Sequence, residues 1–487
     1  MKRQNLLILL VAALLFFQSA CNNQPHYKAL IVTGQNNHLW KASYPVLKLL
    51  LDQTGLFTTD TLVSPPRRGD MSKFDPKFSN YDVIVLDYNG DSWSDKTKKD
   101  FVDYVKNGGG VVVYHAADNS FPDWKEYNEI IGLGGWGNRN EKSGPYVYYK
   151  GNEIVRDTSK GIGGTHAARS DYVVKMRNLD HPITKGMPVQ WMHANDELYS
   201  LLRGPGENME ILATALTGQR MFVRNPNAPP AGQGAPNANI QNRQGANAGQ
   251  GTRQGANANQ GTRPGTTANQ GTRPRTAQGG AAGATAANRG ARGQQGATVA
   301  PEVPAGPPPR DEPVLFTIKY GKGRIFHTVL GHADKGGGPA MQCVGFIVTF
   351  QRGAEWAASG KVTQKIPFDF PTVSGTVLRP DFKEMTLDDA VGMIGSYEIE
   401  KSTKYHNLIL NYIQNLAGDE KGLQEIEKKM VDVLKSKDAT VESKKLILRD
   451  LSWIGSDYSV SAIKDLSGNP ELKDEAEFAL ARLKPGN

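Results

Sequence analysis

Residues 108–119 read Gly-Gly-Gly-Val-Val-Val-Tyr-His-Ala-Ala-Asp-Asn, and this stretch decides the fold class. Val111–Tyr114 is a run of residues with high β-propensity that follows a glycine stop and leads directly into His115. An apolar run without alternation predicts a strand covered on both faces, which is typical of a parallel sheet flanked by helices. His115 then has two interpretations: a polar residue that ends the strand, or a functional group held at the edge of the sheet.

The same pattern continues on both sides of this strand, with short apolar runs between segments of helically spaced apolar residues. Helices are expected around Val46–Leu51 and Phe101–Val105. Further strands are expected at 29–33, 83–87, 172–175, 211–214, 314–319 and 324–330. We therefore expect an α/β domain over residues 27–365, with helices on both faces of its sheet.

A low-complexity segment at residues 225–312 interrupts this domain. A unit of the type Gly-Thr-Arg-Pro-Gly-Thr-Thr-Ala-Asn-Gln recurs from Gly251, and it offers no apolar face on which repeats could stack. The composition predicts a disordered insertion, which a domain tolerates because loop-closure entropy rises slowly with length. Its function is open between a passive tether and a segment that contacts polyanions or cell-surface glycans through its arginines.

The net charge of +8 comes from this insertion and from the N-terminus. Residues 225–310 hold eight Arg and one acid, Glu302, which gives +7, and Lys2 and Arg3 add +2. The remainder is 8 − 7 − 2 = −1, so the folded parts are close to neutral. The basic charge is therefore no sign of a nucleic-acid-binding domain, and we expect no nucleic-acid partner.

The N-terminus has the features of a signal peptide over residues 1–20. Lys2 and Arg3 precede an apolar segment from Leu6 to Phe17, which is short for a membrane span. Small residues then lead into Cys21, as in a bacterial lipobox, although Gln18 stands where an aliphatic residue is usual. We expect an exported protein that is anchored to a bacterial membrane through a lipid on Cys21, with ordinary secretion as the alternative.

The C-terminal part, residues 384–487, has a helical pattern throughout. Thr386-Leu-Asp-Asp389 is suited to cap a helix, and Leu423, Ile426 and Met430 share a helical face. The stretch from Asn469 to Ala476, followed by further leucines, resembles a HEAT-type repeat helix. A small helical module of this kind favours binding of a protein partner over catalysis, because it contains no cluster of acids, His or Cys.

Nine histidines are the main candidates for chemistry, and several of them follow strand ends or lie in glycine-rich loops. They are His26, His38, His115, His166, His181, His193, His327, His332 and His406. In open α/β sheets, ligands bind beyond the carboxyl ends of the strands. The placement of His38, His115 and His332 after predicted strands is the physical reason to group them.

Each histidine also has an ordinary structural interpretation. His38 is suited to cap the helix that follows it, and His181 in Asp180-His-Pro182 is better explained as part of a turn. His327 alternates along a strand and is better explained by packing. His166 in a glycine loop has no such explanation, so we favour a functional role for it.

Two kinds of chemistry suit histidines with carboxylates. One is general acid–base catalysis, and the other is binding of a divalent metal, the only cofactor that these residue types suggest. For the metal, His166, His193 and His332 are the candidate ligands. The sequence contains no His-Glu-x-x-His motif, no phosphate-binding loop and no Gly-x-Ser-x-Gly nucleophile elbow.

Taken together, these motifs resemble the ThuA-like (trehalose utilisation) family. The resemblance rests on the loop with His38 and Trp40 and on the stretch from Gly108 to Asp118. It also rests on three later motifs: Asp180-His-Pro182, Asp196-Glu-Leu-Tyr199, and the segment from Gly321 to His332. The resemblance implies a flavodoxin-like sheet, similar to that of class I glutamine amidotransferases. Those enzymes have a nucleophilic Cys where this chain has His115, so glutaminase activity is not expected, and Cys343 lies too far along the chain to replace it.

The resemblance further implies a role in carbohydrate metabolism, with sugars or oxidised (keto) sugars as the substrate class. It implies His115, Glu197 and Asp118 as catalytic residues. The substrate-binding residues that it implies are His38, Trp40, His166, Asp196, Tyr199 and His332. Ser170 stands where related loops would have a second His, which weakens the case for a metal cluster in that loop.

Two functions therefore remain open at this point. One is a carbohydrate-active enzyme of the hydrolase, lyase or isomerase type, in which Trp40 or Trp136 stacks on a sugar ring. The other is a non-catalytic glycan-binding or scaffold lipoprotein that recruits a partner enzyme through its helical module.

Overall fold

The structure is a computed structural model that describes residues 26–218 and 309–483. The predicted signal peptide, Cys21 and nearly all of the low-complexity insertion lie outside these residues. The final residues expected for the insertion are described, and they belong to a strand that begins at Asp311 rather than at Val314. Residues 311 and 312 are therefore part of the folded domain, because both sides of this strand are paired.

The described strands extend most of the predicted ones by one to four residues. They are β1 (Tyr27–Thr33), β2 (Phe57–Val63), β3 (Val83–Leu86), β4 (Gly110–Tyr114), β5 (Tyr146–Lys150), β6 (Glu153–Asp157), β7 (Thr165–His166), β8 (Ser170–Met176), β9 (Gln190–Asp196), β10 (Tyr199–Ser200), β11 (Met209–Leu216), β12 (Asp311–Tyr320) and β13 (Gly323–Thr328). Two of the strands, β7 and β10, pair only with each other.

The helices fall into an N-terminal and a C-terminal group. The first group comprises α2 (Trp40–Asp52), α3 (Asp95–Lys106), α4 (Lys125–Ile131), α5 (Gly338–Gln342) and α6 (Val344–Ser359). The second comprises α7 (Leu387–Ile394), α8 (Lys404–Asn415), α9 (Glu420–Lys435), α10 (Val441–Ile454), α11 (Asp457–Leu466) and α12 (Lys473–Arg482). His38 caps no helix, since α2 begins after Leu39 without a side-chain cap.

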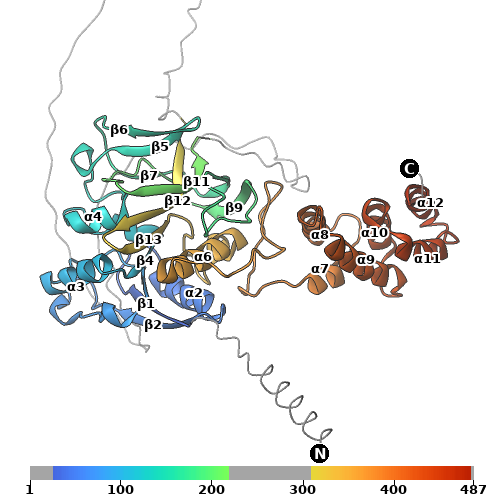
Figure 1. Ribbon diagram of the computed structural model, residues 1–487, viewed down its shortest axis with the longest axis horizontal. Helices are drawn as coiled ribbons and strands as arrows, with labels where there is room; N and C mark the ends of the chain where they lie inside the picture. The colour runs from blue at the N-terminus through green and yellow to red at the C-terminus, as the bar shows by residue number, and fades with distance from the viewer. Residues whose placement is uncertain (1–25, 219–308, 484–487) are drawn as a thin grey trace, which may run out of the picture. The chain divides into compact units, whose positions relative to one another are not determined.

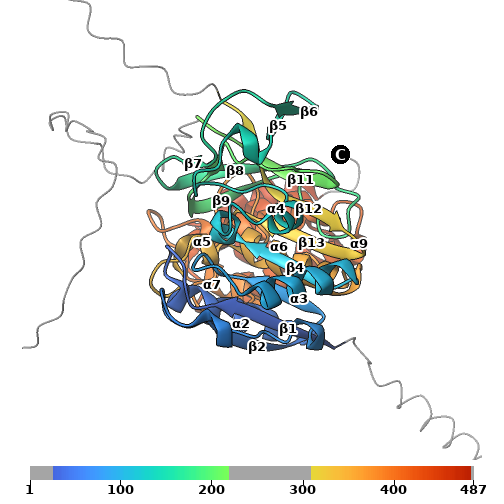
Figure 2. The ribbon, with the colours of Figure 1, turned by 90° about the vertical axis from the view of Figure 1, so that its left-hand side faces the viewer.

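The other strands form one 11-stranded mixed sheet, whose main path runs in the order β2-β1-β3-β4-β13-β12-β11-β8-β9 (Figures 1 and 2). Strand β5 branches from this path by pairing with β12, and β6 pairs with β5. The strands from β2 to β13 are parallel, and those from β13 to β9 are antiparallel. The parallel half has the flavodoxin-like order, with the crossover reversing between β1 and β3. The fold class predicted from the sequence is confirmed, with an antiparallel half that the apolar runs alone did not reveal.

Helices cover both faces of this sheet, as Figure 1 shows. Helices α2 and α6 pack together on one face, and α3 and α4 lie against the other. The strands between them are buried on both sides, which explains their continuous apolar runs. The carboxyl ends of β1, β3, β4 and β13 therefore lie at one edge of the sheet, where a ligand site is expected.

Helices α7–α12 are built around an apolar core of their own. Ile426, Met430, Ile447, Leu451 and Ala476 are among its buried residues. Thr386 caps α7 through a reciprocal pair of hydrogen bonds with Asp389, as the sequence suggested. This confirms that the C-terminal region is helical.

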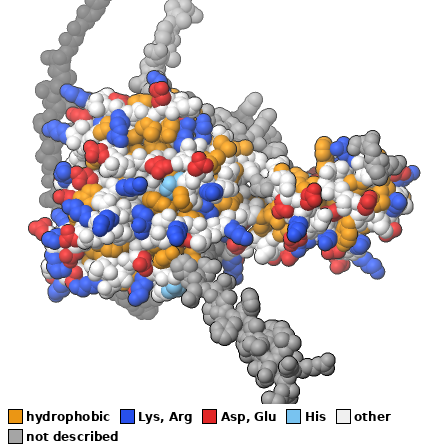
Figure 3. Space-filling model, viewed as in Figure 1, with side chains coloured by type: hydrophobic (Ala, Val, Ile, Leu, Met, Phe, Trp, Pro, Cys, Tyr) orange, Lys and Arg blue, Asp and Glu red, His pale blue; other side chains and the backbone are white. Residues whose placement is uncertain are grey.

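Charged side chains are distributed evenly over the visible face of the α/β domain. In Figure 3, Lys and Arg side chains of the described residues alternate with Asp and Glu rather than gathering in one basic area. Among the residues described, none of the helices combines the length and the apolar character needed to cross a bilayer.

Candidate active site

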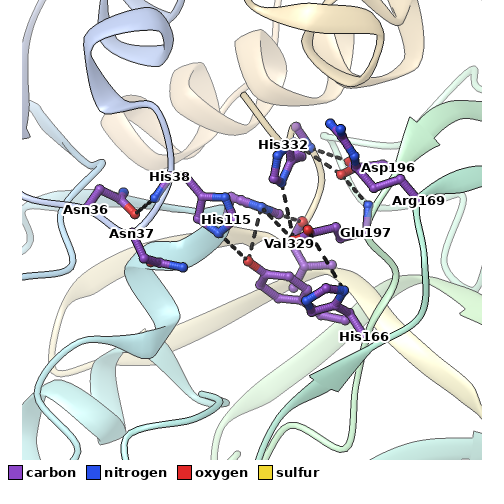
Figure 4. A network of polar contacts seen from close by, with 12 residues as sticks. Asn36, Asn37, His38, His115, His166, Arg169, Asp196, Glu197, Val329 and His332 are labelled. Carbon is purple, nitrogen blue, oxygen red and sulfur yellow. Dashed lines mark hydrogen bonds and ion pairs between the residues drawn. The ribbon is translucent and has the colours of Figure 1, made fainter. Parts of the chain in front are cut away.

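Three histidines from three different strand ends meet at the carboxyl edge of the sheet (Figure 4). His38 lies in the loop after β1, His115 follows β4 directly, and His332 lies four residues beyond β13. Together with Glu197, just after β9, they place one ligand atom each within 4.8 Å of one another. The cluster lies beside the crossover reversal, where open α/β sheets bind ligands.

His115 is held in one orientation by the backbone. It has a left-handed φ of 45°, which is uncommon for a residue other than glycine and turns the chain sharply at the end of β4. Its Nδ1 lies 2.6 Å from the carbonyl oxygen of Val329, so Nδ1 carries the proton and donates it. Burial lowers the pKa of His115, so the ring is neutral at pH 7 and Nε2 presents a lone pair to the cluster.

His38 faces the other two rings edge-on. Its ring centroid lies 4.7 Å from that of His115 and 4.6 Å from that of His332. Burial, together with repulsion from these two imidazoles, lowers the pKa of His38 to about 3. His38 is therefore neutral at physiological pH and, like His115, is suited to bind a cation through a ring nitrogen.

Glu197 and His332 form the charged pair of the cluster. Oε2 of Glu197 lies 3.3 Å from Nδ1 of His332 and 3.9 Å from Nε2 of His115. Burial alone would raise the pKa of Glu197, but the hydrogen bond and charge of His332 outweigh it and lower the pKa to about 2. For His332, burial would lower the pKa, but Glu197 raises it above its usual value.

Asp196 lies behind the cluster and points away from it. Its oxygens accept hydrogen bonds from Nε2 of His193 at 2.7 Å and from the backbone N–H groups of Glu197, Gly331 and His332, at 2.7, 2.6 and 3.2 Å. One buried carboxylate thus fixes the backbone of both loops that carry Glu197 and His332. This arrangement suits Asp196 to position both loops, and Asp196 does not line the cavity described below. The expected contact of Asp196 with a substrate stays a prediction.

A cavity of about 510 Å³ opens in front of the cluster. Its lining is mostly polar, with one indole and one phenol ring. The lining residues are Asn37, His38, Asn89, Asn119, Trp136, Gly137, His166, Glu197, Tyr199 and His332. Amide, imidazole and carboxylate groups beside a half-buried aromatic wall suit a small polar ligand.

His166 lies at the rim of the cavity and is about 39% exposed. Its Nδ1 lies 3.9 Å from Oε1 of Glu197, and its ring is 5.9 Å from that of Trp136. The short pairing of β7 with β10 sets His166 opposite Tyr199. Its Nδ1 also lies 2.9 Å from the carbonyl oxygen of Ala167, and His166 is not one of the four converging residues.

Several residues that were grouped with the site lie elsewhere. Asp118 is fully buried, 3.6 Å from Nε2 of His327, and does not line the cavity. His193 is fully buried against Asp196 and is not one of the converging residues, so its position does not favour it as a metal ligand. Trp40 stacks on Tyr44, whereas Trp136 faces the cavity. Cys343 is a buried free cysteine.

The sequence reasoning missed the asparagines of the cavity. Asn37 and Asn89 hydrogen-bond to each other at 2.6 Å, and both follow strand ends, as does Asn119. The rule that polar residues after parallel strands share one edge would have found them, because it applies to amides as well as to histidines.

The four converging residues suit a divalent metal. Three imidazole nitrogens and one carboxylate oxygen are ligands that Zn²⁺ and related ions accept, and donors of one metal lie about 3–4 Å apart. The four donor atoms already lie within 4.8 Å of one another, so they would need to move only slightly closer to bind one ion. A metal-binding histidine usually donates its other ring N–H to a carbonyl or carboxylate that orients the ring, and Nδ1–H of His115 donates to the carbonyl of Val329 in this way.

Comparisons with known proteins point to one family. A model of the ThuA family, described as trehalose utilisation, matches residues 28–248. The chain is 40% identical to a ThuA-like protein of known structure from Parabacteroides merdae, with a TM-score of 0.54, and the match covers 74% of this chain and all of that one. A ThuA-like protein from Bacteroides uniformis is 16% identical, with a TM-score of 0.36 and coverage of 71% and 96%.

None of the curated proteins compared with the chain matches it. No comparison identifies α7–α12 as HEAT-type repeats, so that interpretation stays a prediction.

Proposed function

Because the chain belongs to the ThuA family, described as trehalose utilisation, we propose that it is a carbohydrate-active enzyme that works on sugars or keto-sugars in this cavity. The observation that carries the proposal is the convergence of His38, His115, His332 and Glu197 beside a polar cavity with an indole wall, which three of them line and behind which His115 is buried. A non-catalytic sugar-binding protein needs the wall and the amides, but it has no use for three histidines and a carboxylate within 4.8 Å.

We propose that these four residues hold one divalent metal. Such an ion would act as a Lewis acid toward a sugar carbonyl or hydroxyl oxygen. Two of the histidines are neutral, and Glu197 is ionised at physiological pH, so the set is ready to bind a cation without losing several protons first.

The remaining residues of the cavity would bind the sugar and move protons. Trp136 presents its ring to the cavity and is suited to stack on a pyranose face. Asn37, Asn89 and Asn119 offer amide donors and acceptors to hydroxyl groups. His166, half-exposed beside Glu197, would carry protons to and from solvent.

The experiment combines metal analysis with turnover. The purified full-length protein is expected to hold about one equivalent of a divalent metal and to convert a member of a glycoside and keto-glycoside panel. His115→Ala and Glu197→Gln should each weaken metal binding by at least about 10- to 100-fold, the loss that is typical when a group that only orients a metal ligand is removed, and should abolish turnover. His406→Gln is the matched control, because His406 pairs with Asp450 within the helical region.

The other outcomes separate the alternatives. Turnover by metal-free protein would exclude the metal and leave acid–base catalysis by His115 and Glu197. Saturable sugar binding without turnover, unchanged by Glu197→Gln, would favour the non-catalytic glycan-binding lipoprotein instead.

We also propose that the protein is exported and held at a membrane by a lipid on Cys21, with the helical region available to a protein partner. The basic and apolar segments before Cys21 support this. Cys21→Ser should move the protein from the membrane fraction to the soluble fraction of the cells that make it. Wild-type protein found only in the soluble fraction would contradict the lipid anchor.

A further inference from the structure

Tyr199 connects two of the four converging residues. Its hydroxyl lies 3.1 Å from Nε2 of His115 and 3.2 Å from Nε2 of His38. The phenol ring stacks on His115, with ring centroids 4.6 Å apart, and Trp136 packs edge-on against it at 4.8 Å. The ring is almost completely buried, so its position is set by packing, and only the hydroxyl hydrogen is free to change direction.

The proton positions in this bridge follow from the backbone. His115 is neutral and its Nδ1–H donates to Val329, so its Nε2 is an acceptor (Figure 4). Tyr199 must therefore donate its only hydroxyl hydrogen to His115. The oxygen of Tyr199 is then the acceptor for His38, whose Nε2 carries the proton of that neutral ring.

His115 has only one nitrogen with which to bind a metal. Since Nδ1 is committed to the carbonyl of Val329, a metal ion must take the lone pair of Nε2. That is the same lone pair that accepts the hydrogen bond from Tyr199. One lone pair does not serve a metal and a hydroxyl donor at the same time.

We propose that a divalent metal displaces the Tyr199 hydrogen bond from His115, and that the freed hydroxyl becomes the donor to a substrate oxygen in the cavity. The proposal rests on the metal site proposed above. In the metal-free protein the Tyr199 hydroxyl forms hydrogen bonds with the imidazoles of His115 and His38. In the loaded protein its hydroxyl faces the cavity that it lines, close to the ion, and is a substrate-binding group that is formed only when the metal is present.

The test is the Zn²⁺ affinity of the full-length protein, measured by competition with a chelating dye. Tyr199→Phe removes the competing hydrogen bond and should tighten Zn²⁺ binding by about 2- to 10-fold, the value of one ordinary hydrogen bond. Tyr172→Phe is the matched control, because Tyr172 is equally buried and its hydroxyl has no partner among the described residues. It should leave the Zn²⁺ affinity unchanged.

Two further readouts separate this role from simple packing. Adding Zn²⁺ to wild-type protein should change the near-ultraviolet tyrosine difference spectrum, and this change should be absent in Tyr199→Phe. If the protein turns over a sugar, Tyr199→Phe should bind metal more tightly yet react more slowly. If Tyr199 only filled space, the substitution would lower both the metal affinity and the reaction rate.

The outcomes distinguish this proposal from the metal site itself. If wild-type protein binds no divalent ion, both proposals are overturned. If it binds Zn²⁺ but Tyr199→Phe binds it equally or more weakly, or if the tyrosine spectrum does not change, the metal site stands and the displacement of Tyr199 is wrong.

Discussion

Asp87 lies beneath the loop that carries His38. The carboxylate, at the end of β3, accepts hydrogen bonds from Thr33 at 3.0 Å, from Ser43 at 2.7 Å and from Nδ2 of Asn36 at 3.2 Å. Oδ1 of Asn36 in turn accepts the backbone N–H of His38 at 3.1 Å. The buried carboxylate therefore fixes the loop of His38, as Asp196 fixes those of Glu197 and His332.

This carboxylate predicts a pH dependence of stability. Burial raises the pKa of Asp87 to about 7, while its three hydrogen bonds oppose the rise. Between its ordinary pKa of 3.8 and about 7, the folded protein holds a proton that the unfolded chain has released. The free energy of unfolding should therefore fall as pH rises through this range, by about 4 kcal/mol at most for this group.

Urea unfolding of wild type and Asp87→Asn at pH 5 and pH 7 measures this. The wild type should lose more stability than Asp87→Asn between the two values. A residual loss should persist in the variant, because burial also raises the pKa of Glu312 to about 7. Equal losses in both proteins would show that Asp87 does not titrate in this range.

The sequence located the acids near the site but could not say which of them faces it. Asp196 and Glu197 are adjacent, and at the end of a strand neighbouring side chains point to opposite sides. A shift of one residue in the strand exchanges the two. The sequence therefore identifies the pair of acids but not their separate roles. Asp196 is distinguished by the hydrogen bonds that it accepts from the backbone of Gly331 and His332, which lie far away in the sequence.

At the scale of elements, the parallel strands were predictable and their antiparallel neighbours less so. Strands β3 and β4 are buried on both faces, so they appear as apolar runs. Strand β2 alternates buried and exposed residues in its first half and is rich in Thr, and β6 has no fully buried residue, so neither gives a strong signal. β9 was missed because its polar residues, His193 and Asp196, are buried as a pair.

Helix α6 shows why packing contacts escape sequence patterns. Nearly all of its residues are buried, so it lacks the polar face by which an amphipathic helix is recognised. A side chain on Gly345 would come within 2.1 Å of the Trp191 ring, and one on Gly353 within 2.1 Å of Phe326. The helix thus approaches β9 and β13 closely, and its glycines help to set the strands that carry the site.

At the scale of the whole molecule, the insertion interrupts the domain without interrupting its sheet. Strands β11 and β12 flank residues 219–308 and pair as antiparallel neighbours, with Leu216 opposite Asp311 at their ends. The backbone of Thr217 continues the pairing through a hydrogen bond to Arg310 at 2.9 Å. The two ends of the insertion are therefore held at the distance that a short hairpin turn spans.

Replacing residues 219–308 with a short Asn-Gly turn should therefore preserve the fold. Shortening the loop reduces the entropy cost of closing it, so the variant should be as stable as the wild type or more stable by up to about 3 kcal/mol. Its Zn²⁺ affinity should be unchanged, since the four converging residues belong to neither β11 nor β12 and the joined ends are paired with each other. Thermal unfolding measures the stability, and competition with the chelating dye measures the Zn²⁺ affinity. Asp87→Asn serves as a reference for a change beneath the site. A lower melting temperature or a weaker metal affinity would mean that the insertion contributes contacts to the domain, and that β11 and β12 depend on it for their register.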